Sequence, residues 1–348
     1  MSDCGQALRE GIEHALKDQL DSTWWANRDE QAFDAKLWAQ IEELGLFQLF
    51  TGDENATSLE EAHGAVQALA SLSIPLPATD TLMAHWLASQ VGLSLPEGPV
   101  VLAPTGVESK PAITGTLQEP LLSGDVHNVP WGGTATLLLE AKRDEDTVWC
   151  VVNPEHCSPD NRTGLHGEPR PHLKFHALGL DPSAVAKAPN DTLALNAGAA
   201  LRAVEMASAL SRAMDMCVEY TRERVQFGRP LAKFQAIQQQ LAVLASLSTQ
   251  ARVAARRAFV ALESGSSDFV VANAKSAVGQ AASQGAAIAH QSHGAMGFTA
   301  EYGLHRLTRR IWTWREDFGN ELYWSTQVGK HVANAGADGL WGLLAEEP

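Results

Sequence analysis

Positive charge is scarce in this sequence, and no long apolar run occurs in it. Its 348 residues hold 26 Lys and Arg against 41 Asp and Glu, so the formal net charge is −15 at pH 7. Binding to nucleic-acid phosphates needs clustered cations, and this balance argues against a nucleic-acid partner, although a few local arginines suffice for a nucleotide-sized ligand. No apolar run approaches the roughly 18–20 residues that cross a bilayer, so no membrane association is expected.

Cysteine is also rare. The four cysteines, Cys4, Cys150, Cys157 and Cys217, form no C-x-x-C pair and imply no disulfide framework. The first nine residues lack the basic patch and apolar core of a secretory signal. Reduced thiols and a cytoplasmic location are therefore expected. His156 lies between Cys150 and Cys157, but this spacing matches no zinc pattern, and no metal site is predicted.

The patterning divides the chain into three predicted domains. Residues 1–98 predict an N-terminal helical domain, with helices at 6–20, from 33 to a stop at Gly45, 58–71 and 79–90. Residues 99–189 predict a small antiparallel β domain, with strands at 100–102, 135–141, 147–153 and 173–178. Residues 190–348 predict a four-helix bundle, with helices at 191–226, 231–264, 268–293 and 302–332. The fold class is thus α+β and mainly α.

The corner between the first two bundle helices carries the main candidate site. Residues 220–240 read YTRERVQFGRPLAKFQAIQQQ, and Gly228 and Pro230 interrupt the helical pattern there. Arg224, Phe227 and Gln235 surround this corner, where a guanidinium, an aromatic ring and an amide can hold a planar ligand that bears phosphates. The plain alternative is a helical hairpin with solvated charges.

The corner strongly resembles the acyl-CoA dehydrogenase family, in which an R-x-x-F-G corner and a following Phe-Gln helix start bind FAD. The matching residues are Arg224, Phe227, Gly228, Phe234 and Gln235. The resemblance implies that Arg224 pairs with the FAD pyrophosphate, Gln235 hydrogen-bonds the cofactor and Phe227 packs against it. A guanidinium suits this role because its contacts with phosphate can be bidentate. Helices, a β domain and four long helices are also the family's order of domains.

A second family marker follows the third bundle helix. The segment QSHGAMGFT, residues 291–299, resembles the family's Q-x-x-G-G-x-G-[FY]-[TS], which reaches the FAD held mainly by a neighbouring subunit. Gln291 is the matching side chain, and Gly294 lets the backbone approach a ligand closely. The alternative is a glycine-rich break between helices, with His290 and His293 as surface or packing residues.

The resemblance fails at the position of the catalytic base. In the family a glutamate abstracts the substrate α-proton while the flavin takes the β-hydride, and burial can raise the pKa of a glutamate to suit this task. Alignment from Gln291 without gaps places Phe318 there, and a phenyl ring cannot accept a proton. Some members carry the glutamate on the first bundle helix, but that position falls near Gly198. The nearest carboxylate on that helix is Glu205.

Two carboxylates beside Phe318 are weak candidates for a displaced base, Glu316 and Glu321. With Asp317 they more simply form a charged helix face. The β domain departs from the family as well, because residues 112–119 read AITGTLQE without the family's G-S-D. Pro130 stands where the family has a hydroxyl near the flavin, and Trp131 either stacks on a ring or belongs to the core.

These departures suggest a partner subunit. The resemblance implies an acyl-CoA dehydrogenase heteromer, expected as a heterotetramer, in which this chain contributes half of a shared FAD site beside a catalytic subunit. The substrate would be an acyl-CoA thioester, such as one with a bulky steroid side chain, and electrons would pass to an electron-transfer flavoprotein. The alternatives are a self-sufficient homo-oligomer with a displaced carboxylate, and a structural paralogue that binds no flavin.

Overall fold

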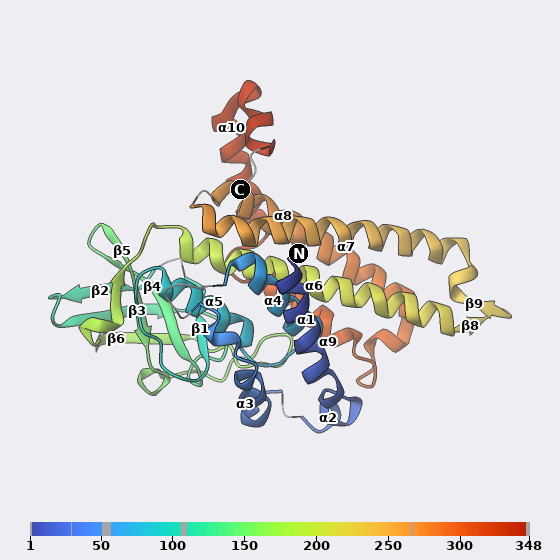
Figure 1. Cartoon of the computed structure of the whole chain (residues 1–348), viewed down its shortest axis with the longest axis horizontal. Helices are drawn as coiled ribbons and strands as arrows, with labels where there is room; N and C mark the ends of the chain where they lie inside the picture. The colour runs from blue at the N-terminus through green and yellow to red at the C-terminus, as the bar shows by residue number, and fades with distance from the viewer. Residues whose placement is uncertain (1, 29, 51–56, 106–109, 266, 346–348) are drawn as a thin grey trace. The chain divides into compact units, whose positions relative to one another are not determined.

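The computed structural model describes residues 2–28, 30–50, 57–105, 110–265 and 267–345. It confirms the predicted fold class, a mainly helical chain with a small sheet and a C-terminal helical bundle (Figure 1). Two compact units emerge from the packing. One contains Met1–Arg28, Leu59–Ile74 and Arg202–Pro348, and the other contains Asp29–Ser58 and Pro75–Leu201. The predicted three-domain division stays a prediction.

The sheet lies in the second unit and is built on one buried strand. β4 (Thr136–Arg143) is covered on both faces, and it pairs antiparallel with β5 (Asp146–Val152). The order β6-β3-β2-β4-β5-β7 adds four strands, and β1 also pairs with β4. These strands are β1 (Val100–Leu102), β2 (Ala112–Gly115), β3 (Pro120–Val126), β6 (Leu173–Gly179) and β7 (Val185–Lys187).

The sheet corrects one detail of the prediction. It is mixed, because β1 and β2 each pair in parallel with β4, whereas the sequence predicts antiparallel pairing throughout. The strands β2, β3 and β7 were missed, since β2 and β7 are short and half-exposed and Gly124 breaks the alternation in β3. Period-two patterning is weak in such strands.

The helices of the same unit cover aromatic core residues. α3 (Ala35–Glu43) ends two residues before Gly45, whose φ of 71° confirms that the helix stops there. The Trp38 ring on α3 stacks on Phe47 with centroids 5.1 Å apart. α5 (Ala78–Ser89) is buried on nearly every side, and the Thr81 hydroxyl on it accepts a hydrogen bond from the Val100 amide of β1.

The other unit is a helical assembly. α1 (Asp3–Leu16) crosses α4 (Leu59–Ser71) at the glycine pair Gly5 and Gly64, and α2 (Ser22–Ala26) is short. The bundle contains α6 (Leu193–Glu223) from Arg202 onward, α7 (Gln235–Ala261) and α8 (Asp268–His293). Alanine and glycine let these helices approach closely; a Cβ at Gly285 of α8 would collide with Leu210 of α6.

The fourth predicted bundle helix is wrong as a single helix. It is divided into α9 (Leu304–Glu316) and α10 (Glu321–Ala345), because Phe318 and Gly319 between them have φ values of 54° and 93°. α10 itself is kinked at Gly336, where φ is 67°. Left-handed backbone at consecutive positions cannot continue a helix. None of the helices in the described ranges combines the length and apolarity that a membrane crossing requires.

Candidate functional site

The corner after α6 is a β-hairpin. α6 ends at Glu223, three residues earlier than predicted, and the short strands β8 (Val225–Gln226) and β9 (Arg229–Pro230) pair antiparallel. Phe227 and Gly228 occupy the two-residue turn with φ values of 52° and 77°, as a type I′ turn requires. The hairpin projects beyond the end of α6 (Figure 1).

The hairpin presents the three predicted FAD contacts to solvent. Phe227 is 91% exposed, and Arg224 and Gln235 are exposed as well. Within the described residues, neither the Arg224 guanidinium nor the Gln235 amide has a side-chain hydrogen bond or ion pair. Arg229 differs, since its guanidinium lies 4.2 Å from the centroid of the Phe234 ring. All three side chains are therefore accessible to a ligand.

The glycine-rich segment lies at the same end of the bundle as this corner. The Tyr220 ring on α6 stacks on His293, the last residue of α8, with centroids 4.6 Å apart. The next residue is Gly294, with φ of 59° and open space where a Cβ would lie. Gln291 is exposed one turn earlier. The structure thus joins two segments that are about 70 positions apart in the sequence.

The histidines of this segment are packing residues, as the alternative interpretation predicted. The His290 Nε2 lies 2.9 Å from the Thr308 hydroxyl, and its ring stacks on Phe298 with centroids 4.2 Å apart. The His293 Nε2 lies 3.0 Å from the Tyr302 hydroxyl. Burial lowers the pKa of both histidines, so both are neutral at pH 7 and hold the segment through hydrogen bonds and stacking.

The position aligned with the family's base is a buried phenylalanine. Phe318 lies in the loop between α9 and α10 and is 3% exposed. Its carbonyl accepts a hydrogen bond from the Trp324 indole at 2.8 Å, and the Arg202 guanidinium of α6 lies 5.7 Å from its ring centroid. A phenyl ring accepts no proton, so this loop position offers packing and no base.

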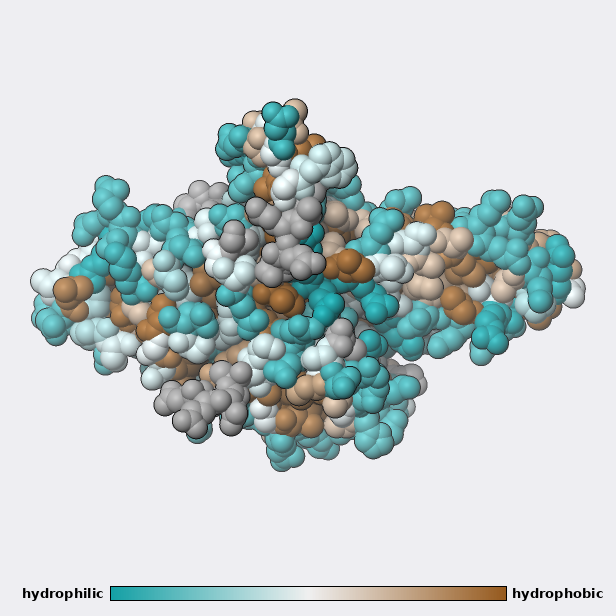
Figure 2. All heavy atoms as spheres, turned by 45° about the horizontal axis from the view of Figure 1, so that its top comes forward, coloured by the Kyte–Doolittle hydropathy of each residue, from teal (hydrophilic) through white to brown (hydrophobic). Residues whose placement is uncertain are grey.

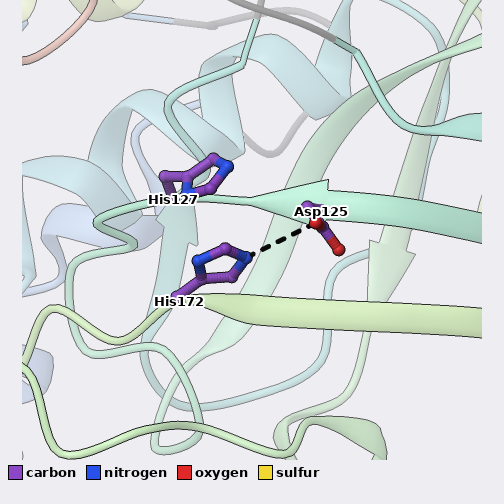
Figure 3. Close-up of side chains that lie close together, drawn as sticks. All are labelled: Asp125, His127 and His172. Carbon is purple, nitrogen blue, oxygen red and sulfur yellow. Dashed lines mark ion pairs between the residues drawn. The ribbon is translucent and has the colours of Figure 1, made fainter.

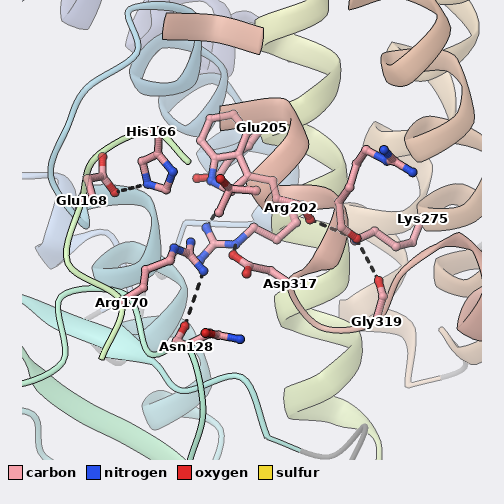
Figure 4. Close-up of polar contacts among 12 residues, drawn as sticks. Asn128, His166, Glu168, Arg170, Arg202, Glu205, Lys275, Asp317 and Gly319 are labelled. Carbon is pink, nitrogen blue, oxygen red and sulfur yellow. Dashed lines mark hydrogen bonds and ion pairs between the residues drawn. The ribbon is translucent and has the colours of Figure 1, made fainter. Parts of the chain in front are cut away.

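A balanced set of buried charges surrounds this loop. The Arg202 guanidinium donates to Glu205 at 2.7 Å on α6, and its Nε lies 3.0 Å from the Asp317 carboxylate (Figure 4). Glu205, the nearest carboxylate to the alternative base position, is thus tied in an ion pair. Burial lowers the pKa of Lys275 on α8 to about 8, partly opposed by Asp317. Arg202, Lys275, Glu205 and Asp317, the buried charge cluster, are all at most 6% exposed.

Lys275 fixes the loop by capping a helix. Its ammonium donates to the carbonyls of Trp314, Arg315 and Gly319 at 3.1, 2.8 and 3.0 Å. These carbonyls lie at the C-terminal end of α9 and just beyond it, where the helix leaves acceptors without partners and where a cation is favourable. Lys275 is not among the residues predicted from the sequence; a lone lysine inside an alanine-rich helix is the signal that could have identified it.

The two weak base candidates occupy different environments. Glu316 is exposed and accepts a hydrogen bond from Asn320 at 3.3 Å. Glu321 holds Arg315 in a bidentate pair at 2.6 and 2.9 Å and packs against Gly279. Burial raises the pKa of Glu321, but the hydrogen bonds and charge of Arg315 outweigh it and leave that pKa lowered. Both placements favour a structural role.

The second unit holds the other residues singled out in the sequence. Trp131 is 1% exposed, and the Phe33 ring meets it edge-on at 5.7 Å between centroids, so Trp131 is a core residue. Cys150 is buried in β5, while the Cys157 thiol lies 3.8 Å from the Asn153 carbonyl. All four cysteines are free. Figure 4 also shows the buried pair of His166 and Glu168, 2.8 Å apart.

The hairpin end of the bundle carries exposed groups of the kinds that contact a dinucleotide. The Arg224 guanidinium and the amides of Gln235 and Gln291 have no polar partner among the described residues, and with the exposed Phe227 ring they suit a pyrophosphate and a planar ring system. The Phe227 ring is 91% exposed and meets the Phe234 ring edge-on, with centroids 6.1 Å apart, while the type I′ turn accounts for its left-handed backbone.

Comparison with known proteins finds relatives by sequence. Residues 191–323 match the sequence profile of the acyl-CoA dehydrogenase C-terminal domain. The 3-sulfinopropanoyl-CoA desulfinase of Paraburkholderia xenovorans is 34% identical over 54% of this chain, and the match spans about half (53%) of that relative's length. The acyl-CoA dehydrogenase IpdE2 of Mycobacterium tuberculosis is 27% identical over 82% of this chain and 83% of its own.

A solved structure extends the comparison to the whole fold. The ChsE4-ChsE5 complex from Mycobacterium tuberculosis superposes with a TM-score of 0.88, at 20% identity, over 97% of this chain and 99% of that one. Residues 191–323 thus form an acyl-CoA dehydrogenase C-terminal domain by sequence, and over 82% of its length the chain is similar to a curated acyl-CoA dehydrogenase. The solved structure adds agreement of the whole fold.

Proposed function

We propose that this chain is the partner subunit of a heteromeric acyl-CoA dehydrogenase and supplies half of a shared FAD site. The proposal rests mainly on one observation: the position aligned with the base holds a buried Phe318, while Arg224, Phe227 and Gln235 are exposed at the hairpin. A chain that worked alone would need a base in its own pocket. The ChsE4-ChsE5 assembly, which has the same fold, supports the heteromeric form.

The surfaces of α7 and α8 support a partner subunit. No Asp, Glu, Lys or Arg occurs at residues 235–251 of α7 or at 276–291 of α8, although 19% of the chain is charged. We call the exposed residues of these two segments the charge-free face; they include Val243 and Ala287. Hydrophobic residues gather on the part of the helical unit that lies at the right of Figure 2. Depletion of charge marks the core of protein interfaces, so this face suits a second dehydrogenase-like chain.

In the proposed complex each residue of the half-site has a limited task. Arg224 would pair with the pyrophosphate, Gln235 and Gln291 would donate or accept hydrogen bonds, and Phe227 would exclude water from the cofactor. Bound FAD supplies the acceptor for the hydride that leaves the acyl-CoA β-carbon. The α-proton would go to a carboxylate of the catalytic subunit, and the electrons would then pass to an electron-transfer flavoprotein.

The family does not by itself settle the reaction. The curated relatives include a desulfinase as well as dehydrogenases, so a second reaction on an acyl-CoA thioester is open to this scaffold. The missing base argues that this chain performs neither reaction alone. The acyl group is therefore chosen by the catalytic subunit, and a bulky acyl chain such as a steroid side chain is the proposed class.

The first experiment measures flavin content. The chain is purified alone and after co-expression with a candidate catalytic subunit, and FAD is quantified from the visible spectrum. We expect a colourless chain and a yellow, active complex. In the complex, Arg224→Ala should lower FAD occupancy, while the matched control Arg222→Ala, an exposed arginine on the same helix end, should not. Equal occupancy in both variants would remove Arg224 from the site.

The same preparation separates the alternatives. A stoichiometric yellow chain that oxidises an acyl-CoA by itself would show a self-sufficient enzyme. In that case Glu316→Gln or Glu321→Gln should cost about 10²–10⁴-fold in turnover, as loss of a general base does. A complex that stays colourless would instead show a structural paralogue.

A further inference from the structure

Two imidazoles and a carboxylate meet at one end of the β3–β6 strand pair. The side chains of Asp125, His127 and His172 bring their donor atoms within 4.8 Å of one another (Figure 3). The two imidazole rings contact edge-on, with centroids 3.9 Å apart. The His172 Nε2 lies 3.8 Å from the Asp125 carboxylate. Among the described residues, no other set of three potential ligands is so close.

The strand register produces this arrangement. β3 and β6 pair antiparallel, with Val126 opposite Leu173 and Asp125 opposite Lys174. One step beyond the ladder, His127 and His172 therefore face each other. Asp125 lies two residues before His127 and so projects to the same face of the sheet.

Two further contacts fix the ligands. A β-bulge between Leu122 and Gly124 directly precedes Asp125, and bulges re-aim the side chains that follow them. The His172 backbone amide donates to the Asp160 carboxylate at 3.0 Å, and Asp160 also pairs with Arg162 at 2.9 Å. The backbone of both strands is thus held independently of any contact among the three side chains.

The spacing of the donor atoms suits a bound cation better than hydrogen bonds. The buried His172 Nε2 makes no hydrogen bond within the described residues, since 3.8 Å to Asp125 is too long. When two ligand atoms each lie about 2.0–2.2 Å from one ion, they are about 3.4 Å apart at the tetrahedral angle and up to about 4.2 Å apart on opposite sides of the ion. Small side-chain rotations would therefore bring all three donors onto one ion.

We propose that Asp125, His127 and His172 bind one divalent transition-metal ion, with zinc as the best match. Two imidazole nitrogens and one carboxylate oxygen are ligands that zinc accepts, and three protein ligands leave a fourth position for water. The ion would join the end of β3 to the start of β6. Because a folded site binds the ion and an unfolded chain does not, the ion would stabilise the second unit.

The test uses the full chain after removal of metals with EDTA. Calorimetric titration with Zn²⁺ should show one saturable site per chain, and Co²⁺ should give the visible absorption of a four-coordinate ion. His127→Asn and His172→Asn should each weaken zinc binding by at least about 100-fold, because losing even an outer partner of a metal ligand costs 10–100-fold. The matched control is His176→Asn, an exposed histidine on β6 outside the cluster. Cys4→Ser controls for the exposed thiol.

A second measurement needs no variant. Diethyl pyrocarbonate modifies free imidazoles, and peptide mass spectrometry reads each histidine separately. Zn²⁺ should protect His127 and His172 and leave His176 reactive. The proposal is overturned if Zn²⁺ shows no saturable site, if the two histidine variants bind like the His176 control, or if zinc protects neither histidine.

Discussion

Replacing Asp317 with Asn removes one negative charge from the buried charge cluster without changing the side-chain volume much. In the native chain the two cations and two carboxylates of the cluster balance, and all four are at most 6% exposed. The Asp317 carboxylate lies 3.0 Å from Arg202 Nε. The substitution therefore gives the four-residue cluster a net positive charge.

The expected loss of free energy of unfolding follows from this charge imbalance. Removing one partner of a buried ion pair typically costs about 3–5 kcal/mol, because the remaining charge stays desolvated. Arg202 keeps its hydrogen bond to Glu205 at 2.7 Å, so we expect the lower end, about 3 kcal/mol. For a cooperative unit of this size such a loss lowers Tm by roughly 6–12 °C.

The cost should also depend on pH. Burial lowers the pKa of Lys275 to about 8, and Asp317 opposes that effect, so Asp317→Asn lowers the pKa of Lys275 further. Once Lys275 has lost its proton, the variant cluster is neutral again. The Tm difference between Asp317→Asn and the native chain should accordingly be larger at pH 6 than at pH 9.

The assay is thermal unfolding followed by tryptophan fluorescence at both pH values. Glu316→Gln is the matched control, since Glu316 is the neighbouring residue but exposed, and surface substitutions of this kind stay within about 0.5 kcal/mol. If Asp317→Asn is as mild as Glu316→Gln, the cluster does not hold the loop. A Tm difference that does not change with pH would refute the role assigned to Lys275.

Two further predictions concern the helical unit. The folded-state pKa of Lys275, about 8, lies below its unfolded value of 10.5, so the unfolded chain binds more protons between these two pH values. The free energy of unfolding should therefore rise with pH across that window, by up to about 3 kcal/mol. In urea titrations, Lys275→Met should abolish this rise. Gly64→Ala on α4 should cost about 1–3 kcal/mol of stability, because the new Cβ would collide with the Gly5 backbone. Gly11→Ala on α1 has open space around it and should stabilise the chain by up to about 1 kcal/mol. Equal effects of the two substitutions in thermal unfolding would contradict the close helix crossing.

The fold could be predicted largely because its helices are long and strongly patterned. α8 begins and ends at the residues the sequence indicated, and α4 and α5 agree within one residue. The break at Phe318 and Gly319 could not be predicted in this way. A glycine after an aromatic residue inside an amphipathic pattern costs only about 1 kcal/mol in a helix, and tertiary contacts from Lys275 decide the outcome.

The same distinction between local pattern and tertiary contact applies to the candidate sites. Arg224 and Gln291 were found through local strings that resemble a family, and local strings survive in the sequence. The buried charge cluster and the Asp125, His127 and His172 group were missed because each joins segments that are far apart in sequence and that meet only through helix packing or strand register. Such groups require a tertiary structure.

Two phenylalanines with left-handed backbone show how the halves of the site differ. A bulky residue at positive φ is strained and persists only where its surroundings fix it. At Phe318 this chain supplies those surroundings, with the ring buried beside Arg202 and the carbonyl bonded to Trp324. At Phe227 the hairpin itself fixes the backbone, because a type I′ turn requires positive φ at both of its central residues. The Phe227 ring meets the Phe234 ring edge-on, with centroids 6.1 Å apart, and remains 91% exposed. Buried contacts therefore explain the backbone of the first phenylalanine and turn geometry explains that of the second. The feature of Phe227 that supports the proposed contact with a cofactor of a partner subunit is the exposure of its ring, and not strain in its backbone.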